Sequence, residues 1–341
     1  MNFALWIKAL KVIPSVSKEE WGRLDLVSRW LVSSRAAVLV MTVISAVLAG
    51  LFALRAGEFR IVPWVFLTLG LVLAHATNNL FNDYTDYVRG VDKENYFRTL
   101  YGPQLVAQGL MSTRRLLLFV AVTAALVVPC AVLVFVIDGW DPMILALMVV
   151  GLAFVLFYTW PLKYIALGEI SVLLVWGPLM IGGGYYVLAR HWDWNVLWAS
   201  APYALIVTTV IFGKHIDKMI LDAEKKIWTL PVLIGERAAR AAVLAMLLLP
   251  FALVAAGISV RYFSPAMALV ALAVPALVRT FPRFLEPKPK VRPEWFPDGQ
   301  GGWPLYFAPI AFVYTRSFGL WFLAGLVGEV VLRVFLPSFW R

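Results

Sequence analysis

Hydrophobic positions along the chain gather into long runs that are separated by short polar connections. An apolar run of about 20 residues is long enough to cross a bilayer as a helix. The pattern predicts nine such helices, over residues 32–54, 61–82, 115–137, 142–160, 166–189, 196–213, 238–260, 264–281 and 317–336. The count is open by one, because 196–213 is short and 304–315 is apolar but proline-bounded. Since the runs do not alternate as barrel strands do, we expect an all-α integral membrane protein with a single polytopic domain over residues 1–341.

The composition agrees with this class, since 62% of the residues are hydrophobic and the mean hydropathy is +0.81. A formal net charge of +10 could indicate nucleic-acid binding, but the lysines and arginines concentrate in alternate connections. The connections between them hold only Arg55, Arg60, Arg190 and Arg261. The positive-inside rule then places the N-terminus in the cytoplasm and the C-terminus outside. We expect a multi-pass protein of the plasma membrane without a nucleic-acid partner.

Residues 1–30 form a separate segment before the core of 31–336. Its apolar residues Phe3, Trp6, Ile7, Leu10 and Ile13 recur at helical spacing, which predicts an amphipathic helix on the cytoplasmic membrane surface. Lysines interrupt the apolar run of residues 1–14, and no small-residue cleavage site follows it. A cleavable signal peptide is therefore not expected.

The first polar cluster begins inside an apolar run, within residues 75–109. Asn79, Asp83 and Asp86 share one face if the helix continues to Tyr87, because residues three, four and seven apart are neighbours on a helix. Carboxylate and amide oxygens suit Mg²⁺ that also binds phosphate. The alternative is a solvated helix end, although grouped aspartates repel unless a cation joins them.

The second polar cluster covers residues 212–240 and follows the sixth predicted helix, as the first cluster follows the second helix. This offset of four helices suggests two similar halves that place their charged loops on one face and close a cavity between them. The candidate residues here are Asp217, Asp222, Lys214, His215 and Lys226. The alternative is a solvated loop whose mixed charges form surface ion pairs of little energetic value.

Four segments occur together in order: NDYTDYVRGVD (82–92), YGPQLVAQG (101–109), YTWPLKYIALGEISVLLVWGPLMIGGGYYV (158–187) and TLPVLIG (229–235). With these segments the chain resembles the UbiA superfamily of intramembrane prenyltransferases over roughly residues 30–336. Within it, the resemblance is closest to the MenA type, the 1,4-dihydroxy-2-naphthoate polyprenyltransferases of menaquinone biosynthesis. The resemblance implies a UbiA-like fold of nine transmembrane helices around a central cavity.

The implied activity is Mg²⁺-dependent transfer of a polyprenyl group from polyprenyl diphosphate to an aromatic acceptor, such as a quinone precursor, within the membrane. The first family motif matches Asn82, Asp83, Asp86 and Asp92, and Asn79 matches an asparagine that commonly precedes it. The second family motif usually has two aspartates with three residues between them. Here Asp217 and Asp222 are five apart, which separates them by about 140° on a regular helix. We therefore expect the helix to end or bend between them, so that at least one faces the diphosphate.

Other side chains have candidate roles in this chemistry. The metal ligands expected from both motifs are Asp83, Asp86, Asp92, Asp217 and Asp222, and the basic residues expected to contact phosphate directly are Lys93, Arg98, Lys214, Lys225 and Lys226. Tyr158 could stabilise an allylic carbocation with its ring face, and His215 could accept a proton from the acceptor. Two alternatives stay open: a non-aromatic lipid acceptor, and a cation-coupled transporter. Transport is disfavoured because the acidic residues gather at one membrane face.

Overall fold

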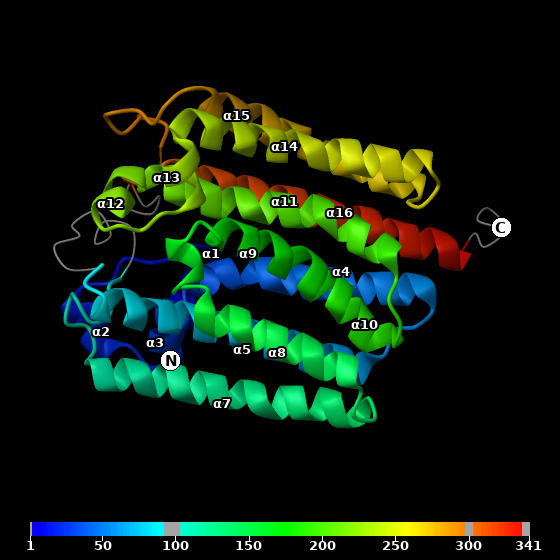
Figure 1. The fold of residues 1–341 in the computed structure, drawn as a ribbon, viewed down its shortest axis with the longest axis horizontal. Helices are drawn as coiled ribbons and strands as arrows, with labels where there is room; N and C mark the ends of the chain where they lie inside the picture. Colours follow the sequence, from blue (N-terminus) through cyan, green and yellow to red (C-terminus); the bar gives the residue numbers. More distant parts are fainter. Residues whose placement is uncertain (1, 92–102, 297–302, 336–341) are drawn as a thin grey trace.

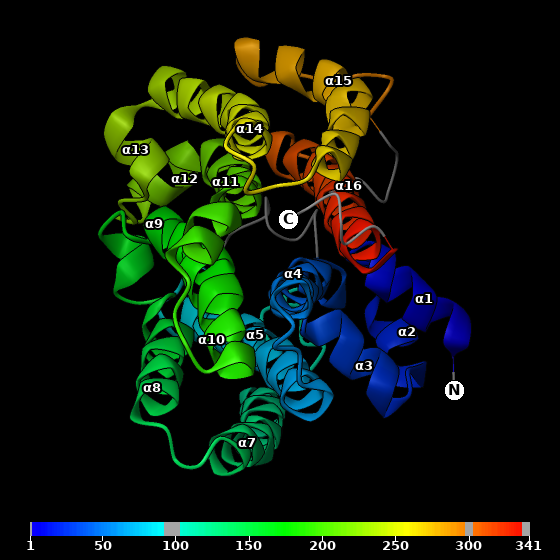
Figure 2. The same cartoon turned by 90° about the vertical axis from the view of Figure 1, so that its right-hand side faces the viewer.

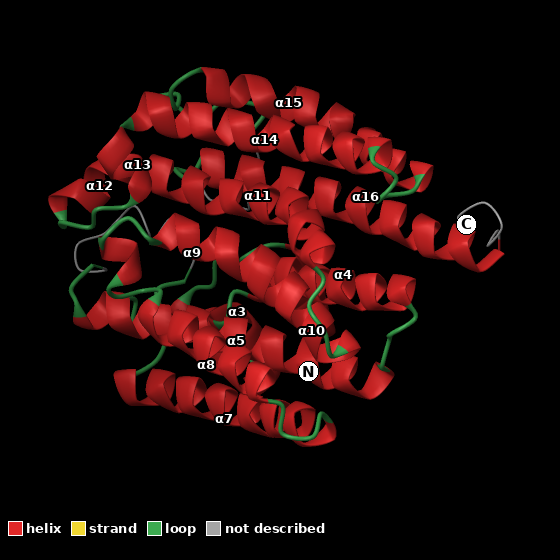
Figure 3. Cartoon of the chain, turned by 45° about the vertical axis from the view of Figure 1, so that its right-hand side comes forward, coloured by secondary structure: helices red, strands yellow, loops and turns green. Residues whose placement is uncertain are grey.

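The computed structural model describes residues 2–91, 103–296 and 303–335. Over these residues the chain is helical, with an isolated β-bridge between Ile165 and Trp228 (Figure 3). The N-terminal segment holds α1 (Phe3–Lys11), α2 (Lys18–Arg23) and α3 (Leu26–Ser33). The first half of the core comprises η1 (Ala36–Leu39), α4 (Val40–Ala56), α5 (Ile61–Val88), α7 (Thr113–Ile137), α8 (Pro142–Phe157), η2 (Leu162–Tyr164), α9 (Gly168–Leu174), η3 (Val175–Gly182) and α10 (Gly183–Ala189). The second half comprises α11 (Trp194–Asp217), α12 (Met219–Glu224), α13 (Leu230–Ile234), α14 (Glu236–Ser259), η4 (Pro265–Ala273), α15 (Val274–Leu285) and α16 (Phe307–Phe335).

Among the described residues, eight helical segments are long and apolar enough to cross a membrane. They correspond to eight of the nine predicted runs, so the predicted class of membrane protein is confirmed. The remaining run, 142–160, forms α8, which is apolar but only 16 residues long. Asp141 caps this helix by accepting a hydrogen bond from the Met143 N–H at 2.8 Å, and the chain leaves the helix ahead of Pro161. The proline-bounded run 304–315 is not a separate helix, because most of it belongs to α16.

The two halves of the core lie side by side, with their helices along the long axis of the molecule (Figure 1). Viewed along the helices, α5, α7 and α8 lie on one side and α11, α14, α15 and α16 on the other (Figure 2). The central helix α11 packs against α14 and α16 of its own half and against α9 and η3 of the other half. Phe263, Phe318 and Phe322 are buried in the resulting core.

Close approach of α11 to the start of α16 depends on Gly213. A Cβ atom at this position would lie 2.8 Å from the Phe307 carbonyl carbon and 2.9 Å from the Ala308 nitrogen. Since backbone atoms cannot swing aside as a flexible side chain can, only glycine fits without moving a helix. The junction places Asp217, one turn beyond Gly213, directly beneath the first residues of α16.

The charged loops of the two halves meet at one end of the molecule, on the left in Figure 1. The Lys225 Nζ of the second loop donates hydrogen bonds to the backbone carbonyls of Gly90, at 3.3 Å, and Val91 of the first loop. This contact confirms the prediction that the two halves place their charged loops on the same face.

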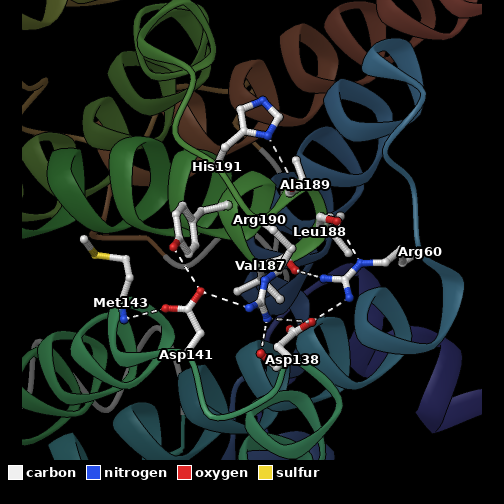
Figure 4. A network of polar contacts seen from close by, with 10 residues as sticks. Arg60, Asp138, Asp141, Met143, Val187, Leu188, Ala189, Arg190 and His191 are labelled. Atoms are coloured by element: carbon white, nitrogen blue, oxygen red, sulfur yellow. Dashed lines mark hydrogen bonds and ion pairs between the residues drawn. The ribbon is translucent and has the colours of Figure 1, made fainter.

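The opposite end of the molecule carries a network of ion pairs (Figure 4). Asp138 contacts Arg60 at 2.6 Å and Arg190 at 3.2 Å, and Arg190 also contacts Asp141 at 3.3 Å. The network joins the start of α5, the α7–α8 connection and the end of α10. A second buried pair, Arg55 with Glu329 at 3.2 Å, ties α4 to α16. Sequence reasoning treated these arginines only as topology markers, whereas the structure uses them to join helices.

The N-terminal segment packs beside the core through α1, which contacts α3 and η1. The Trp6 Nε1 donates a hydrogen bond to the Ser28 Oγ at 2.9 Å. Phe3, Ile7 and Leu10 are each more than half exposed and form an uncovered apolar face. This face is what a helix lying on a membrane surface requires, and that location stays a prediction.

Candidate active site

A cavity of about 1320 Å³ lies within the helical core. Apolar side chains of α5, α7, α8 and η3 form most of its wall, including Leu71, Ala131 and Leu179. Some lining residues, such as Val128 and Val132 of α7 and Leu152 of α8, are also at least half exposed on the outer surface. The cavity therefore reaches the lateral face of the protein between α7 and α8.

Among the described residues, the charged side chains that line this cavity are all basic. We call them the basic rim, and they are Lys11, Arg35, Lys214, Arg279, Arg283 and Arg316. Lys11, Lys214 and Arg283 lie near the ends of their helices, Arg35 lies just before η1, and Arg279 and Arg316 lie within α15 and α16. An apolar space bordered by positive charge suits an amphiphilic anion.

The first motif lies on α5, which runs six residues past the predicted end of its apolar run. Asp83 and Asp86 are buried, and each is bound by a basic residue from another element. Arg35, just before η1, forms an ion pair with Asp83, and the Lys163 Nζ in η2 lies 2.8 Å from the Asp86 Oδ1. Sequence reasoning missed both partners. The available signal for Lys163 was its place inside the segment 158–187, one of the four that carry the family resemblance.

The candidate asparagines Asn79 and Asn82 line the cavity near the carboxylates, as does the adjacent Asn78. The Asn79 Nδ2 donates to the Ser34 carbonyl at 2.9 Å, and the Asn82 Nδ2 donates to the Thr159 Oγ1 at 3.0 Å. The Asn82 Oδ1 is buried without a hydrogen-bond partner among the described residues. An unpaired buried oxygen is costly, so this atom is available to a ligand that brings a positive charge or a donor.

These oxygens fit a magnesium ion in part. Asp83 and Asp86 offer carboxylates and Asn82 offers an amide oxygen, which are the donors Mg²⁺ prefers. Within the described part of the chain, no three Asp, Glu, His or Cys side chains converge as a metal site. A magnesium ion at the first motif would therefore complete its shell with waters and phosphate oxygens. Asp92, Lys93 and Arg98 lie outside the described residues.

The second motif has the helix break that we predicted. Helix α11 ends at Asp217 and α12 begins at Met219. The Asp217 Oδ2 accepts the backbone N–H groups of Tyr306 at 2.9 Å and Ala308 at 3.0 Å, and its Oδ1 accepts that of Phe307 at 3.1 Å. Both oxygens thus cap the start of α16, which favours a structural role for Asp217 over the metal ligation expected from sequence. The Asp222 Oδ1 lies 3.1 Å from the Lys218 Nζ.

Of the other candidates around the second motif, only Lys214 lies at the cavity as the sequence predicted. Lys214 lines the cavity, as a phosphate-binding residue should. His215 is buried outside the cavity lining, and its Nδ1 lies 2.5 Å from the Glu169 Oε1. Lys226 is exposed and has a left-handed backbone with φ of 55°. The structure therefore brings Lys214 to the cavity but not His215 or Lys226.

Aromatic and polar residues line the middle of the cavity. Tyr158 borders it directly beyond the end of α8, as does Trp176 of η3. The Trp176 ring packs edge-on against His75 with centroids 5.1 Å apart, and the His75 Nδ1 lies 2.7 Å from the Thr42 Oγ1. This packing holds the Trp176 indole beside His75, and Trp176 and Tyr158 both supply aromatic side chains to the cavity lining.

The similarity of this chain to known proteins agrees with the structural features described above. Residues 43–296 match the profile of the UbiA prenyltransferase family. The chain is 27% identical over 224 residues to the UbiA prenyltransferase domain-containing protein 1 homolog of Drosophila melanogaster, covering 64% of this chain and 60% of the fly protein. It is 28% identical over 222 residues to the 1,4-dihydroxy-2-naphthoate octaprenyltransferase of Escherichia coli K12, covering 62% and 70%. The chain thus spans about three fifths of the fly relative.

Solved structures share the fold. The apo structure of a UbiA homolog from Aeropyrum pernix K1 matches with a TM-score of 0.62, at 20% identity over 84% of this chain and 97% of that one. At this identity the likeness establishes the helical architecture alone.

Proposed function

Because the chain belongs to the UbiA prenyltransferase family and is a prenyltransferase, we propose that it moves a polyprenyl group from polyprenyl diphosphate to an aromatic acceptor inside the membrane. The acceptor we propose is a quinone precursor of the dihydroxynaphthoate kind, which is what the Escherichia coli relative is named for.

The observation that carries the proposal is the apolar cavity with its basic rim. A prenyl tail gains little by leaving lipid for an apolar wall, because both surroundings are hydrocarbon. Selection of the donor therefore depends on its diphosphate, which the rim attracts by charge. Arg35 belongs to the rim and also binds Asp83, so the diphosphate would sit where the rim meets the first motif.

Asp83, Asp86 and the Asn82 amide oxygen would hold a magnesium ion beside that diphosphate. When bound, the ion supplies positive charge to the leaving group. Lys163 and Arg35 hold the two carboxylates in place, and Arg35 and Lys214 can bind phosphate oxygens directly from the rim.

In the transfer step, the bond between the allylic carbon and the diphosphate oxygen breaks, and its electron pair leaves with the diphosphate. Tyr158 and Trp176 present ring faces that stabilise the allylic cation and exclude water. An aromatic carbon of the acceptor then bonds to the allylic carbon, and the proton that it loses passes to the diphosphate. His215 lies outside the cavity, so we propose that it holds Glu169 rather than accepting this proton.

We further propose that the end carrying the charged loops faces the cytoplasm at the plasma membrane. The lysine and arginine asymmetry along the sequence supports this orientation. Water-soluble diphosphate would then be released on the cytoplasmic side.

The test is a transfer assay in lipid nanodiscs with geranylgeranyl diphosphate and either 1,4-dihydroxy-2-naphthoate or a glyceryl lipid as acceptor. We expect Mg²⁺-dependent diphosphate release together with a prenylated naphthoate. Asp83→Asn and Asp86→Asn should each reduce turnover by about 100-fold or more, since removing transition-state charge stabilisation costs several kcal/mol. Glu19→Gln, an exposed change in α2, should leave it unchanged.

Two results of this assay would contradict different parts of the proposal. A prenylated glyceryl lipid in place of the naphthoate would refute the aromatic acceptor. Near-normal turnover in both aspartate variants would refute the role of the first motif.

A further inference from the structure

Lys218 occupies an unexpected place in the second motif. The family pattern has two aspartates with three residues between them, and the residue that stands in this relation to Asp222 is Lys218. Its Nζ lies 3.1 Å from the Asp222 Oδ1, and both residues are buried. The family pattern expects a carboxylate at position 218. This chain has a lysine there, and the lysine forms an ion pair with the carboxylate of Asp222.

The rest of the second charged loop supplies no replacement carboxylate. Asp217 uses both oxygens to cap α16, Glu224 is exposed, and Glu236 is paired with Arg240 at 3.2 Å. Within the described residues 212–240, a divalent ion would find one carboxylate, already bound by an ammonium group. Mg²⁺ needs several oxygen ligands, and this loop offers one carboxylate where the first motif offers two carboxylates and the Asn82 amide oxygen. This half of the site therefore does not fit a second metal ion.

Tyr164 relates the second motif to the first. Burial raises the pKa of Tyr164, the Asp86 and Asp222 carboxylates raise it further, and Arg89 and Lys218 lower it. Its ring therefore lies within electrostatic range of both motifs, and the Lys163 Nζ is 5.6 Å from the ring centroid. The Tyr164 hydroxyl is buried without a hydrogen-bond partner among the described residues. It is a donor available to a phosphate oxygen between the motifs.

We propose that the Lys218 ammonium group takes the place of a second divalent cation, so that this enzyme holds diphosphate with one magnesium ion at the first motif and with Lys218 from the second. The inference rests on the proposed function, since it concerns how the same diphosphate is bound. Asp222 orients the lysine, and the hydrogen bonds from Lys225 to Gly90 and Val91 hold the second loop against the first. The Mg²⁺ dependence of the reaction is then that of a single ion.

The direct test counts metal ions and needs no variant. The wild-type protein in nanodiscs is titrated with Mn²⁺ in saturating inorganic pyrophosphate, and bound Mn²⁺ is measured by electron paramagnetic resonance. One protein-dependent Mn²⁺ per chain is expected. Zero or two would overturn the proposal.

Two variants of Lys218 sharpen the test. Lys218→Gln should weaken pyrophosphate binding at least tenfold while one Mn²⁺ is still bound, whereas Lys218→Asp should add a second Mn²⁺. Lys290→Gln, an exposed loss of the same charge, is the matched control and should change neither value. Wild-type affinity in Lys218→Gln would overturn the proposal.

The outcome is separable from that of the transfer assay. Two bound Mn²⁺ ions in a protein that makes prenylated naphthoate would remove only this inference. One bound Mn²⁺ in a protein that makes no prenylated product would remove only the proposed function.

Discussion

Asp217→Ala should destabilise the protein without changing how many metal ions it binds. The carboxylate accepts three backbone N–H groups at the start of the 29-residue helix α16, at 2.9, 3.1 and 3.0 Å. A hydrogen bond to a charged group contributes about 1.5–3 kcal/mol, but a whole helix cap rarely exceeds about 2 kcal/mol when it is exposed. Because this cap is buried and leaves several donors unpaired, we expect a loss of about 3–5 kcal/mol in the free energy of unfolding.

Asp217→Asn provides a graded comparison. An amide oxygen can still accept the two N–H groups that the Oδ2 accepts now, but the amide nitrogen cannot accept the third, from Phe307. We expect a smaller loss of about 1–2 kcal/mol. The melting temperature in detergent should therefore be highest for the wild type, lower for Asp217→Asn and lowest for Asp217→Ala.

Gly213→Ala is the matched perturbation of the same junction without a change of charge. Its Cβ would meet the Phe307 carbonyl carbon at 2.8 Å, so it should also lower the melting temperature. The assay combines thermal unfolding with the Mn²⁺ count in pyrophosphate. If Asp217→Asn loses a bound Mn²⁺ while its melting temperature stays at the wild-type value, Asp217 is a metal ligand and the capping interpretation is wrong.

Two further predictions concern the tail and the topology. Ala74→Phe places a ring in the cavity wall of α5, so the kcat/KM ratio of geranylgeranyl over dimethylallyl diphosphate should fall at least tenfold; an unchanged ratio would place the tail elsewhere. In a topology assay, Glu224→Cys should be labelled only from the cytoplasmic side and Asp193→Cys only from the outside, because the charged-loop end is proposed to face inward. The native Cys130 is buried and should stay unlabelled, and reversed labelling would contradict the proposed orientation.

The helices were the most predictable part of the fold, because long apolar runs need no knowledge of their neighbours. The exception at α16 is instructive. Sequence reasoning treated the run 304–315 as proline-bounded, yet α16 begins at Phe307 and contains Pro309 in its first turn. A proline there costs little, since the first N–H groups of a helix have no partner within the helix.

The parts of the site that could be predicted from the sequence were again those that depend on local spacing. The carboxylates of α5 could be placed on one face because helical spacing is local. Their partners could not, because Arg35 and Lys163 reach them from other elements through packing. Asp217 is 89 residues from the first N–H group that it binds, so its role as a cap leaves no local pattern. Lys218 did have a signal in the sequence, because it precedes Asp222 by four residues. The family pattern has an aspartate at this spacing, so a lysine was not expected to take part.

A cavity that binds its substrate through the charge of the substrate binds the product more weakly, because the product lacks that charge. Under the proposed function, the basic rim would attract the donor through its diphosphate, which the prenylated acceptor no longer carries. Its tail would then lie against hydrocarbon-like walls that offer no preference over the bilayer, beside the exposed side chains of Val128, Val132 and Leu152. The lipid product of the proposed reaction would therefore be able to leave sideways without a lid having to open. The ligand that remains bound would then be pyrophosphate, and its departure into water would free the rim for the next donor.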